Sequence, residues 1–206
     1  MNFSQLLGRV IVTSGLIAGA ANATVIDFES LSDGTSVDNA YSGVTFSNAM
    51  VLSAGISLNE FEFPPFSGQN VAFDNGGEIT IDFAAPITQL SAYFTYLMPV
   101  SMTAYDGAMN VVGTDISDYL NNLALSGDAG SLPNELLQVA YAGGISHIVL
   151  AGDPVGSSFV FDDLAYMAAD NSNSNNGQIP EPATLLLLGA GLLGLAASRY
   201  TITNIA

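Results

Sequence analysis

The sequence predicts an all-β protein whose core is a single β-sandwich domain of the sandwich or jelly-roll type. Short runs of β-branched and aromatic residues, such as VIDFE, EITIDF and SSFVFDD, recur between clusters of Gly, Pro, Asn and Asp. About ten such runs follow one another without interleaved helical patterns, which favours a sandwich over an α/β fold. The chain has 206 residues and is 49% hydrophobic, so one domain can bury a proper core.

The first segment, residues 1–23, has the layout of a secretory signal peptide. Arg9 and the α-amino group supply positive charge, and a short apolar stretch follows. Ala21 and Ala23 then place small side chains at the two positions that signal peptidase reads. We expect cleavage after Ala23, so that the exported protein begins at Thr24. A buried N-terminal helix is the alternative.

The globular domain is expected over residues 24–168. Within it, the stretch YDGAMNVVG predicts a β-hairpin that turns at Asp106-Gly107. One short helix is expected near residues 116–123, inside a long connection. An Asn/Ser-rich linker, residues 169–179, follows the domain, because its composition cannot bury a core.

The charge of the chain is strongly one-sided and limits its partners. There are 19 acidic and 2 basic residues, and no Lys or Arg lies between Arg9 and Arg199. Nucleic acid is a poor partner, because phosphate binding needs Lys and Arg. Divalent cations and neutral ligands such as sugars remain open. The chain has no cysteine, so it forms neither disulfides nor thiolate zinc sites.

Motifs for catalysis are scarce. The single histidine, His147, lies in a strand-like apolar run, and the chain lacks G-x-S-x-G and H-E-x-x-H motifs. Many acids are present, but no spacing singles out a pair for glycoside cleavage. A non-enzymatic surface or matrix protein is therefore favoured, with a secreted carboxylate-dependent glycoside hydrolase as the alternative.

The most unusual stretch is NEFEFPPFSG, residues 59–68. Phe61, Phe63 and Phe66 alternate there with acids and prolines. Aromatic side chains beside carboxylates suit stacking on sugar rings. Phenylalanines in a loop also commonly pack beneath the edge of a sandwich, so both interpretations stay open.

A Pro-Glu-Pro triplet, an apolar run and a basic residue follow the linker. Pro180, Glu181 and Pro182 precede the leucine- and glycine-rich residues 183–197, and Arg199 comes after them. The GAGLLG glycines lack the βαβ context of a dinucleotide site. As a helix the run would be roughly 22 Å long, which is short of the ~30 Å hydrocarbon core. It would therefore be a marginal membrane anchor.

This combination, within residues 180–206, resembles the PEP-CTERM sorting signals of Gram-negative bacteria. Such signals are recognised by exosortase, a membrane transpeptidase-like enzyme. The resemblance implies a transient inner-membrane anchor through the hydrophobic C-terminal helix, removal of that tail, and delivery to the cell surface or extracellular matrix. Signal peptidase and exosortase are then the processing partners, and exopolysaccharide is the expected ligand. The family usually has a basic cluster where this chain has Arg199 alone.

The domain also resembles the jelly-roll, galactose-binding-like domains of PEP-CTERM proteins and many carbohydrate-binding modules. The stretches VIDFESLSDGT, TAYDGAMNVVG and FVFDDLAY carry this resemblance. It implies a structural calcium between the first and last strands, with Glu29 and Asp162 as ligands and the loop around Asp33 as a source of further oxygens. Strand alternation places Glu29 and Asp162 opposite the aromatic positions of their strands. Simple solvation of these acids at a strand edge is the alternative.

Overall fold

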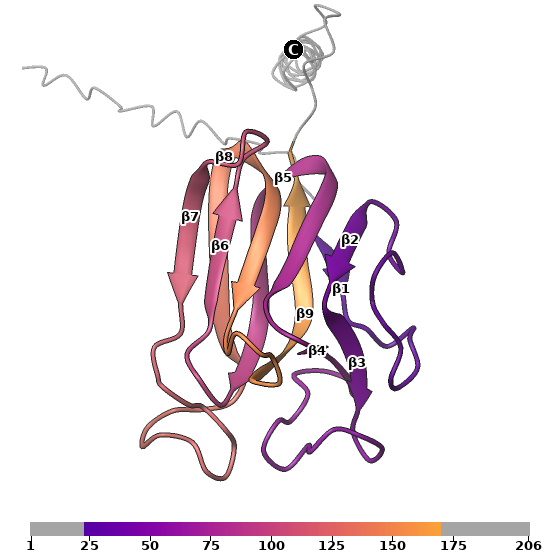
Figure 1. Ribbon diagram of the computed structural model, residues 1–206, viewed down its shortest axis with the longest axis vertical. Coiled ribbons are helices and arrows are strands. Elements are labelled where there is room, and N and C mark those ends of the chain that lie inside the picture. Colours follow the sequence, from indigo (N-terminus) through magenta and orange to yellow (C-terminus); the bar gives the residue numbers. More distant parts are fainter. Residues whose placement is uncertain (1–22, 170–206) are drawn as a thin grey trace, which may run out of the picture. The chain divides into compact units, whose positions relative to one another are not determined.

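The computed structural model of the protein describes residues 23–169, which form nine β-strands and no helix (Figure 1). The strands are β1 (Thr24–Ile26), β2 (Val44–Ser47), β3 (Ala49–Ser53), β4 (Asn70–Asp74), β5 (Ile79–Tyr96), β6 (Ser101–Tyr105), β7 (Val111–Ile116), β8 (Glu135–Ala151) and β9 (Phe159–Ala168). The predicted all-β fold is therefore confirmed. Within the described part, no helix is long and apolar enough to cross a membrane.

Two long strands, β5 and β8, change partners along their length. The first part of β5 pairs with β2 and with the last part of β8, whereas its second part pairs with β9 and with the first part of β8. The strands thus form two hydrogen-bonded layers, β2–β5–β8–β6–β7 and β3–β4–β9–β5–β8, which the long strands join. Strand β1 pairs with β9.

Pro86 and Gly144 lie where the two long strands shift register. Proline has no N–H for the ladder, and regular pairing of β5 with β8 is interrupted between Asp82 and Ile87. Gly144 has a φ of +99°, and a Cβ there would lie 3.0 Å from the Cβ of Pro86. The runs EITIDF and ITQLSAYFTYL predict two separate strands where the structure has β5, and LLQVAYA and SHIVLAG predict two where it has β8. The structure joins them, because the backbone stays extended through the irregularity.

The main core lies between the layers and is rich in aromatic side chains. Phe28, Phe94, Phe159 and Phe161 are each at most 1% exposed. Phe161 packs edge-on against Phe28, with ring centroids 5.4 Å apart, and lies beside Phe94 at 5.7 Å. Aromatic pairs at such distances stabilise a core beyond their buried area. They hold the segment after β1 against β9, its distant neighbour in sequence.

A second apolar cluster covers the opposite face of β9. Val160 lies there with Leu58 and Val71, and Phe63 and Phe73 pack against them. The connection between β3 and β4 supplies Leu58 and Phe63 and so covers this face. The first part of β9, residues 159–162, is therefore buried on both faces, which departs from simple alternation of core and solvent positions.

The hairpin predicted at Asp106-Gly107 is confirmed. Strands β6 and β7 pair antiparallel on either side of it. The Oδ1 atom of Asp106 accepts hydrogen bonds from the main-chain N–H groups of Ala108 and Asn110, each at 2.9 Å. The side chain of Asn110 also donates to this carboxylate, and this bond lowers the pKa of Asp106.

The prediction of a helix near residues 116–123 is wrong. Strand β7 continues to Ile116, and turns and irregular structure follow. The fully buried Asn122 organises this segment: its Oδ1 accepts from the N–H of Tyr96 at 2.7 Å, and its Nδ2 donates to the carbonyls of Phe94 and Leu132. A side chain that binds the main chain in this way competes with helical hydrogen bonds.

Candidate functional site

Two long connections lie at the same end of the sandwich (Figure 1): residues 54–69 between β3 and β4, and residues 117–134 between β7 and β8. Glu62 joins them. Its main-chain oxygen accepts from the N–H of Ala124 at 3.0 Å, and its Oε2 accepts from the N–H of Leu125 at 3.0 Å. The bond from Leu125 lowers the pKa of Glu62. We call the solvent-facing side of residues 54–69 and 117–134 the loop surface.

Of the three phenylalanines in residues 59–68, one packs beneath the sheet edge and two are exposed, so packing holds for one of them and stacking on sugar rings stays open for the other two. Phe63 packs into the second apolar cluster. Phe61 is 71% exposed, and Phe66 is 45% exposed. Phe66 lies flat on Tyr93 of β5, with ring centroids 3.5 Å apart and planes 8° apart. Phe61 and Phe66 are thus available to a ligand, whereas Phe63 is part of the packing.

The second connection adds aliphatic side chains to the loop surface. Leu120, Leu125 and Leu132 are each more than two-thirds exposed. Exposed apolar groups gathered in one region commonly mark interaction sites. Because no Lys or Arg lies between residues 10 and 198, the loop surface offers apolar side chains, main-chain groups and carboxylates. This combination suits a neutral partner.

Glu29 and Asp162 are two of the acids expected to bind calcium. Both accept hydrogen bonds at the C-terminal end of the first connection, residues 54–69 between β3 and β4. The Oε1 atom of Glu29 accepts from the main-chain N–H groups of Gln69 at 2.8 Å and Asn70 at 2.7 Å. The Oδ2 atom of Asp162 accepts from the N–H of Ser67 at 2.9 Å. Glu29 and Asp162 therefore both bind main-chain N–H groups within residues 67–70, and these contacts bring together the two ends of the domain.

Gly68 makes the contact with Glu29 possible. Its φ of +54° lies in the left-handed region, and a Cβ at this position would lie 2.3 Å from the Oε1 atom of Glu29. Any larger residue would therefore displace the carboxylate as well as strain the backbone.

Asp33, the third expected ligand, contacts the other end of the same connection. Its Oδ1 atom accepts from the N–H of Ser53 at 2.8 Å and from the hydroxyl of Ser57. Asn70 links the two acid contacts, because its side chain donates to the carbonyls of Phe28 and Leu31 and accepts from the hydroxyl of Ser53. Sequence reasoning missed Asn70, since a single asparagine at the start of a strand carries no recognisable signal.

The acidic residues do not gather into a complete set of metal ligands. Within residues 23–169, no three Asp, Glu or His side chains lie close enough together to hold a metal ion. Calcium takes 6–8 oxygen ligands, so an ion bound by Glu29 and Asp162 would need main-chain carbonyls or water as well. Calcium binding by Glu29, Asp33 and Asp162 stays a prediction.

Burial changes the ionisation of two carboxyl groups. Asp162 is 1% exposed, and burial raises its pKa to about 6, with a smaller contribution from the negative charge of Asp163. Burial also raises the pKa of Asp74, which is fully buried. Both oxygens of Asp74 accept from the N–H of Ser158 at 2.9 Å. Both acids are therefore buried and accept hydrogen bonds from main-chain N–H groups of other segments.

His147 lies on the outer face of β8, beside polar neighbours. Its Nδ1 atom is 2.7 Å from Oδ1 of Asp82 on β5, and the ring of Tyr105 on β6 lies 5.6 Å away. The expected strand position of His147 is confirmed. Among residues 23–169, no serine hydroxyl forms a hydrogen bond with His147.

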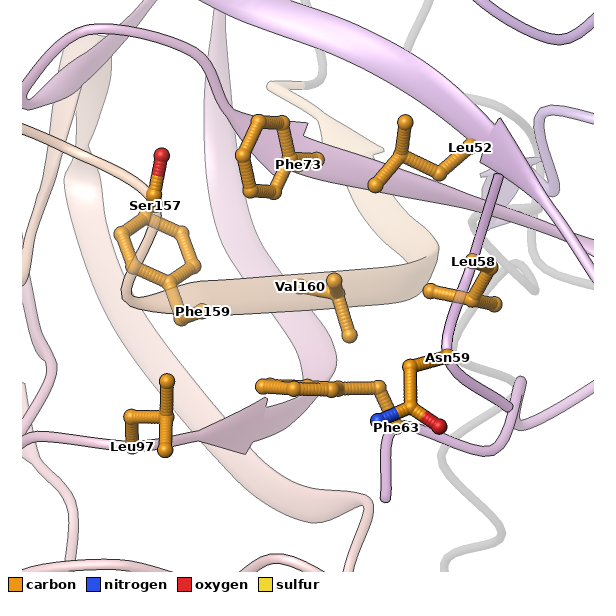
Figure 2. A pocket seen from close by; sticks show the side chains of 9 residues that line it. All are labelled: Leu52, Leu58, Asn59, Phe63, Phe73, Leu97, Ser157, Phe159 and Val160. Atoms are coloured by element: carbon orange, nitrogen blue, oxygen red, sulfur yellow. The ribbon is translucent and has the colours of Figure 1, made fainter. Parts of the chain in front are cut away.

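An apolar cavity of about 190 Å³ lies under the first connection (Figure 2). Strands β3, β4 and β9 and three connections all contribute to its walls, so no single stretch of sequence could have revealed it. Its lining residues are Leu52, Leu58, Asn59, Phe63, Phe73, Leu97, Ser157, Phe159 and Val160.

The predicted targeting residues fall almost entirely outside the described part of the chain. Ala23 is the first described residue and is exposed. Ala21 lies outside the described residues, as do the sorting-signal residues Pro180, Glu181, Pro182 and Arg199.

Several solved structures are similar to this chain at low sequence identity. One is a cleaved adhesin domain of Lys-gingipain, with 12% identity, a TM-score of 0.45, and coverage of 71% of this chain and 99% of that chain. A second adhesin domain of Lys-gingipain, from Porphyromonas gingivalis, has 9% identity, a TM-score of 0.44, and coverage of 71% and 98%. A family 6 carbohydrate-binding module has 12% identity, a TM-score of 0.37, and coverage of 70% and 93%. No curated protein matches the chain.

The sorting signal is the feature that a family comparison identifies. Residues 178–199 match the family model described as the PEP-CTERM protein-sorting motif. This range includes the Pro-Glu-Pro triplet, the apolar run and Arg199. The chain therefore carries a PEP-CTERM sorting signal, as its sequence predicted.

Proposed function

We propose that this is a non-enzymatic protein of the cell surface or extracellular matrix that binds exopolysaccharide through the loop surface. The PEP-CTERM signal at residues 178–199 is the observation that carries this proposal, because the signal implies export and processing by exosortase. Signal peptidase, acting after Ala23, is the second processing enzyme that we propose. Before exosortase acts, residues 183–197 would hold the protein in the inner membrane.

The loop surface supports a neutral carbohydrate as the ligand. A sugar ring has an apolar C–H face, and the exposed rings of Phe61 and Phe66 are flat apolar surfaces. Stacking of Phe66 on Tyr93 fixes one of these rings in place, so little freedom of that side chain is lost on binding. The lack of Lys and Arg in residues 10–198 favours a ligand without phosphate groups.

The ionisation of the buried acids supports binding over hydrolysis. A glycoside hydrolase needs a carboxylic acid with a raised pKa that reaches the scissile oxygen. Burial raises the pKa of Asp74 and Asp162, but these side chains are at most 1% exposed and bind main-chain N–H groups. Neither side chain can contact a polysaccharide at the surface.

The function is tested by incubating the purified protein with exopolysaccharide from the strain that produces it. We expect the protein to be retained on the polymer with no new reducing ends. New reducing ends would instead identify a hydrolase, and a protein that stays free would contradict the proposal.

Variants at exposed positions locate the binding surface. Phe61→Ala should weaken retention, while its free energy of unfolding should stay within about 0.5 kcal/mol of the wild type because the side chain is exposed. Val155→Ala is the matched control, since Val155 is 80% exposed and lies outside the loop surface. Equal retention of both variants would show that the polymer binds elsewhere.

A structural calcium at Glu29 and Asp162, with Asp33 nearby, is a further part of this proposal. At about 100-fold excess of calcium over the dissociation constant, binding would add about 2.7 kcal/mol to the free energy of unfolding. Melting of the protein in EDTA and in excess calcium tests it. No gain for the wild type would exclude the site, and an equal gain for Glu29→Gln and Asp162→Asn would place the ion elsewhere.

A further inference from the structure

The apolar cavity beneath the first connection opens beside the loop surface. Leu58, Asn59 and Phe63, which belong to residues 54–69, line it together with Leu97 (Figure 2). Asn59, which belongs to the loop surface, is exposed, and Leu97 is 44% exposed, so both lie at the rim. A ligand on the loop surface can therefore extend a group into the cavity.

The lining is apolar except at two positions. No charged side chain contributes to it, and the two polar residues are Asn59 and Ser157. Throughout residues 23–169, neither the amide of Asn59 nor the hydroxyl of Ser157 takes part in a hydrogen bond with the protein. Both side chains remain free to donate a hydrogen bond to a ligand.

The size of the cavity limits what it can hold. An apolar cavity of about 150 Å³ accepts benzene, so about 190 Å³ has room for roughly six to eight non-hydrogen atoms. A whole sugar ring is a poor occupant, because its hydroxyl groups would lose water and find few partners among the apolar walls. An apolar group with one hydrogen-bond acceptor fits this lining better.

We propose that the cavity binds a short acyl group that is ester-linked to a sugar of the polysaccharide. The acyl chain lies among Leu52, Leu58 and Phe63, and the ester carbonyl accepts a hydrogen bond from Asn59 or Ser157. This inference rests on the proposed polysaccharide binding and makes acylation the feature by which the protein selects its polymer.

The expected selectivity follows from the apolar area that the acyl chain removes from water. Burial of one CH₂ group is worth about fourfold in affinity. A butyryl group, after the cost of ordering it, should improve binding on the order of tenfold.

Two chemical forms of one polymer test this selectivity. The producing strain's exopolysaccharide is fully de-esterified, and one portion is then re-esterified with butyryl groups at low density. We expect the butyrylated form to bind the protein on the order of tenfold more tightly. Equal affinity for the two forms would overturn the acyl site while leaving polysaccharide binding intact. Binding to neither form would overturn the proposed function itself.

Adjacent residues provide matched variants for the same measurement. Leu97→Gln places a polar group at the rim and should abolish the preference for the butyrylated polymer. Met98→Gln is the control, because Met98 is 46% exposed and does not line the cavity. If both variants keep the preference, or both lose it, the cavity is not the acyl site. Far-UV circular dichroism and melting curves confirm that each variant is folded.

Discussion

Asp162 shows how a single carboxyl group ties the protein's stability to pH. Burial raises its pKa to about 6, even though the N–H groups of Ser67 and Asp163 donate to it. In the unfolded chain an aspartate titrates near pH 3.9. The folded state therefore binds this proton more tightly than the unfolded state. The stability that Asp162 contributes is fully present below about pH 4 and is lost as the pH rises through about 6.

Replacing Asp162 should weaken the pH dependence of stability. In EDTA, the free energy of unfolding of the wild type should fall between pH 4 and pH 7.5, and Asp162→Asn should remove roughly 2 to 3 kcal/mol of that fall. Urea unfolding at the two pH values measures it. Asp74, whose pKa burial also raises, is present in both proteins, so their difference isolates Asp162. Identical pH dependence in the two proteins would contradict the assignment.

The connection between β7 and β8 shows how one side chain can organise an element without regular structure. Asn122 is fully buried and binds the main chain at Tyr96, Phe94 and Leu132. The N–H of Asn122 also donates to the carbonyl of Tyr96 at 3.1 Å. These bonds attach the connection to the end of β5 and so position the exposed leucines of the loop surface.

Removal of the Asn122 side chain should therefore destabilise the domain. Asn122→Ala leaves buried main-chain groups at Tyr96 and Phe94 without partners, and each such group costs about 1–3 kcal/mol. We expect a total loss of about 3 kcal/mol, or a melting temperature lower by roughly 6–12 °C. Thermal and urea unfolding measure both values.

Asn121 provides the control for this prediction. Its Oδ1 atom accepts from the N–H of Leu123, its Nδ2 atom donates to the carbonyl of Ser126 over a long 3.4 Å, and its side chain is only partly buried. Asn121→Ala should cost at most about 1 kcal/mol. If the two alanine variants lose the same stability, the burial of Asn122 does not have the role assigned to it.

At the scale of the whole molecule, two processing events should define the exported protein. Cleavage after Ala23 makes Thr24 the first residue, and exosortase should remove the apolar residues 183–197. N-terminal sequencing and mass spectrometry of the exported protein test both. An exported chain that begins at Met1, or that still ends at Ala206 in a strain with exosortase, would contradict one event or the other.

The Pro-Glu-Pro triplet can be tested separately from the apolar run. Replacement of Pro180 and Pro182 by alanine leaves the run intact, so the protein should still reach the membrane. It should then accumulate there in an uncut form, because the signal that exosortase reads is altered. Release of this variant at the rate of the wild type would show that the triplet is not the recognition element.

Local pattern was sufficient to assign side chains to the faces of strands. Ile26 and Phe28 are buried whereas Asp27 and Glu29 are exposed, as alternation near β1 predicts. On β9, alternation correctly placed Phe161 in the main core and Asp162 opposite it. It could not show that the opposite face is buried too, because the chain that covers it comes from residues 54–69.

By itself, the sequence determined the all-β class, the hairpin at Asp106 and the PEP-CTERM signal, because each depends on residues that are close together in the chain. Only the tertiary structure decided that Phe61 is exposed while Phe63 is packed. It also decided that the segment around Asn122 is irregular, with the Asn122 side chain bound to the main chain, where a helix was expected. It also decided which main-chain groups Glu29 and Asp162 hold, and it formed the apolar cavity. These features depend on contacts between distant segments, and a segment's own residues do not specify which other segment will cover it.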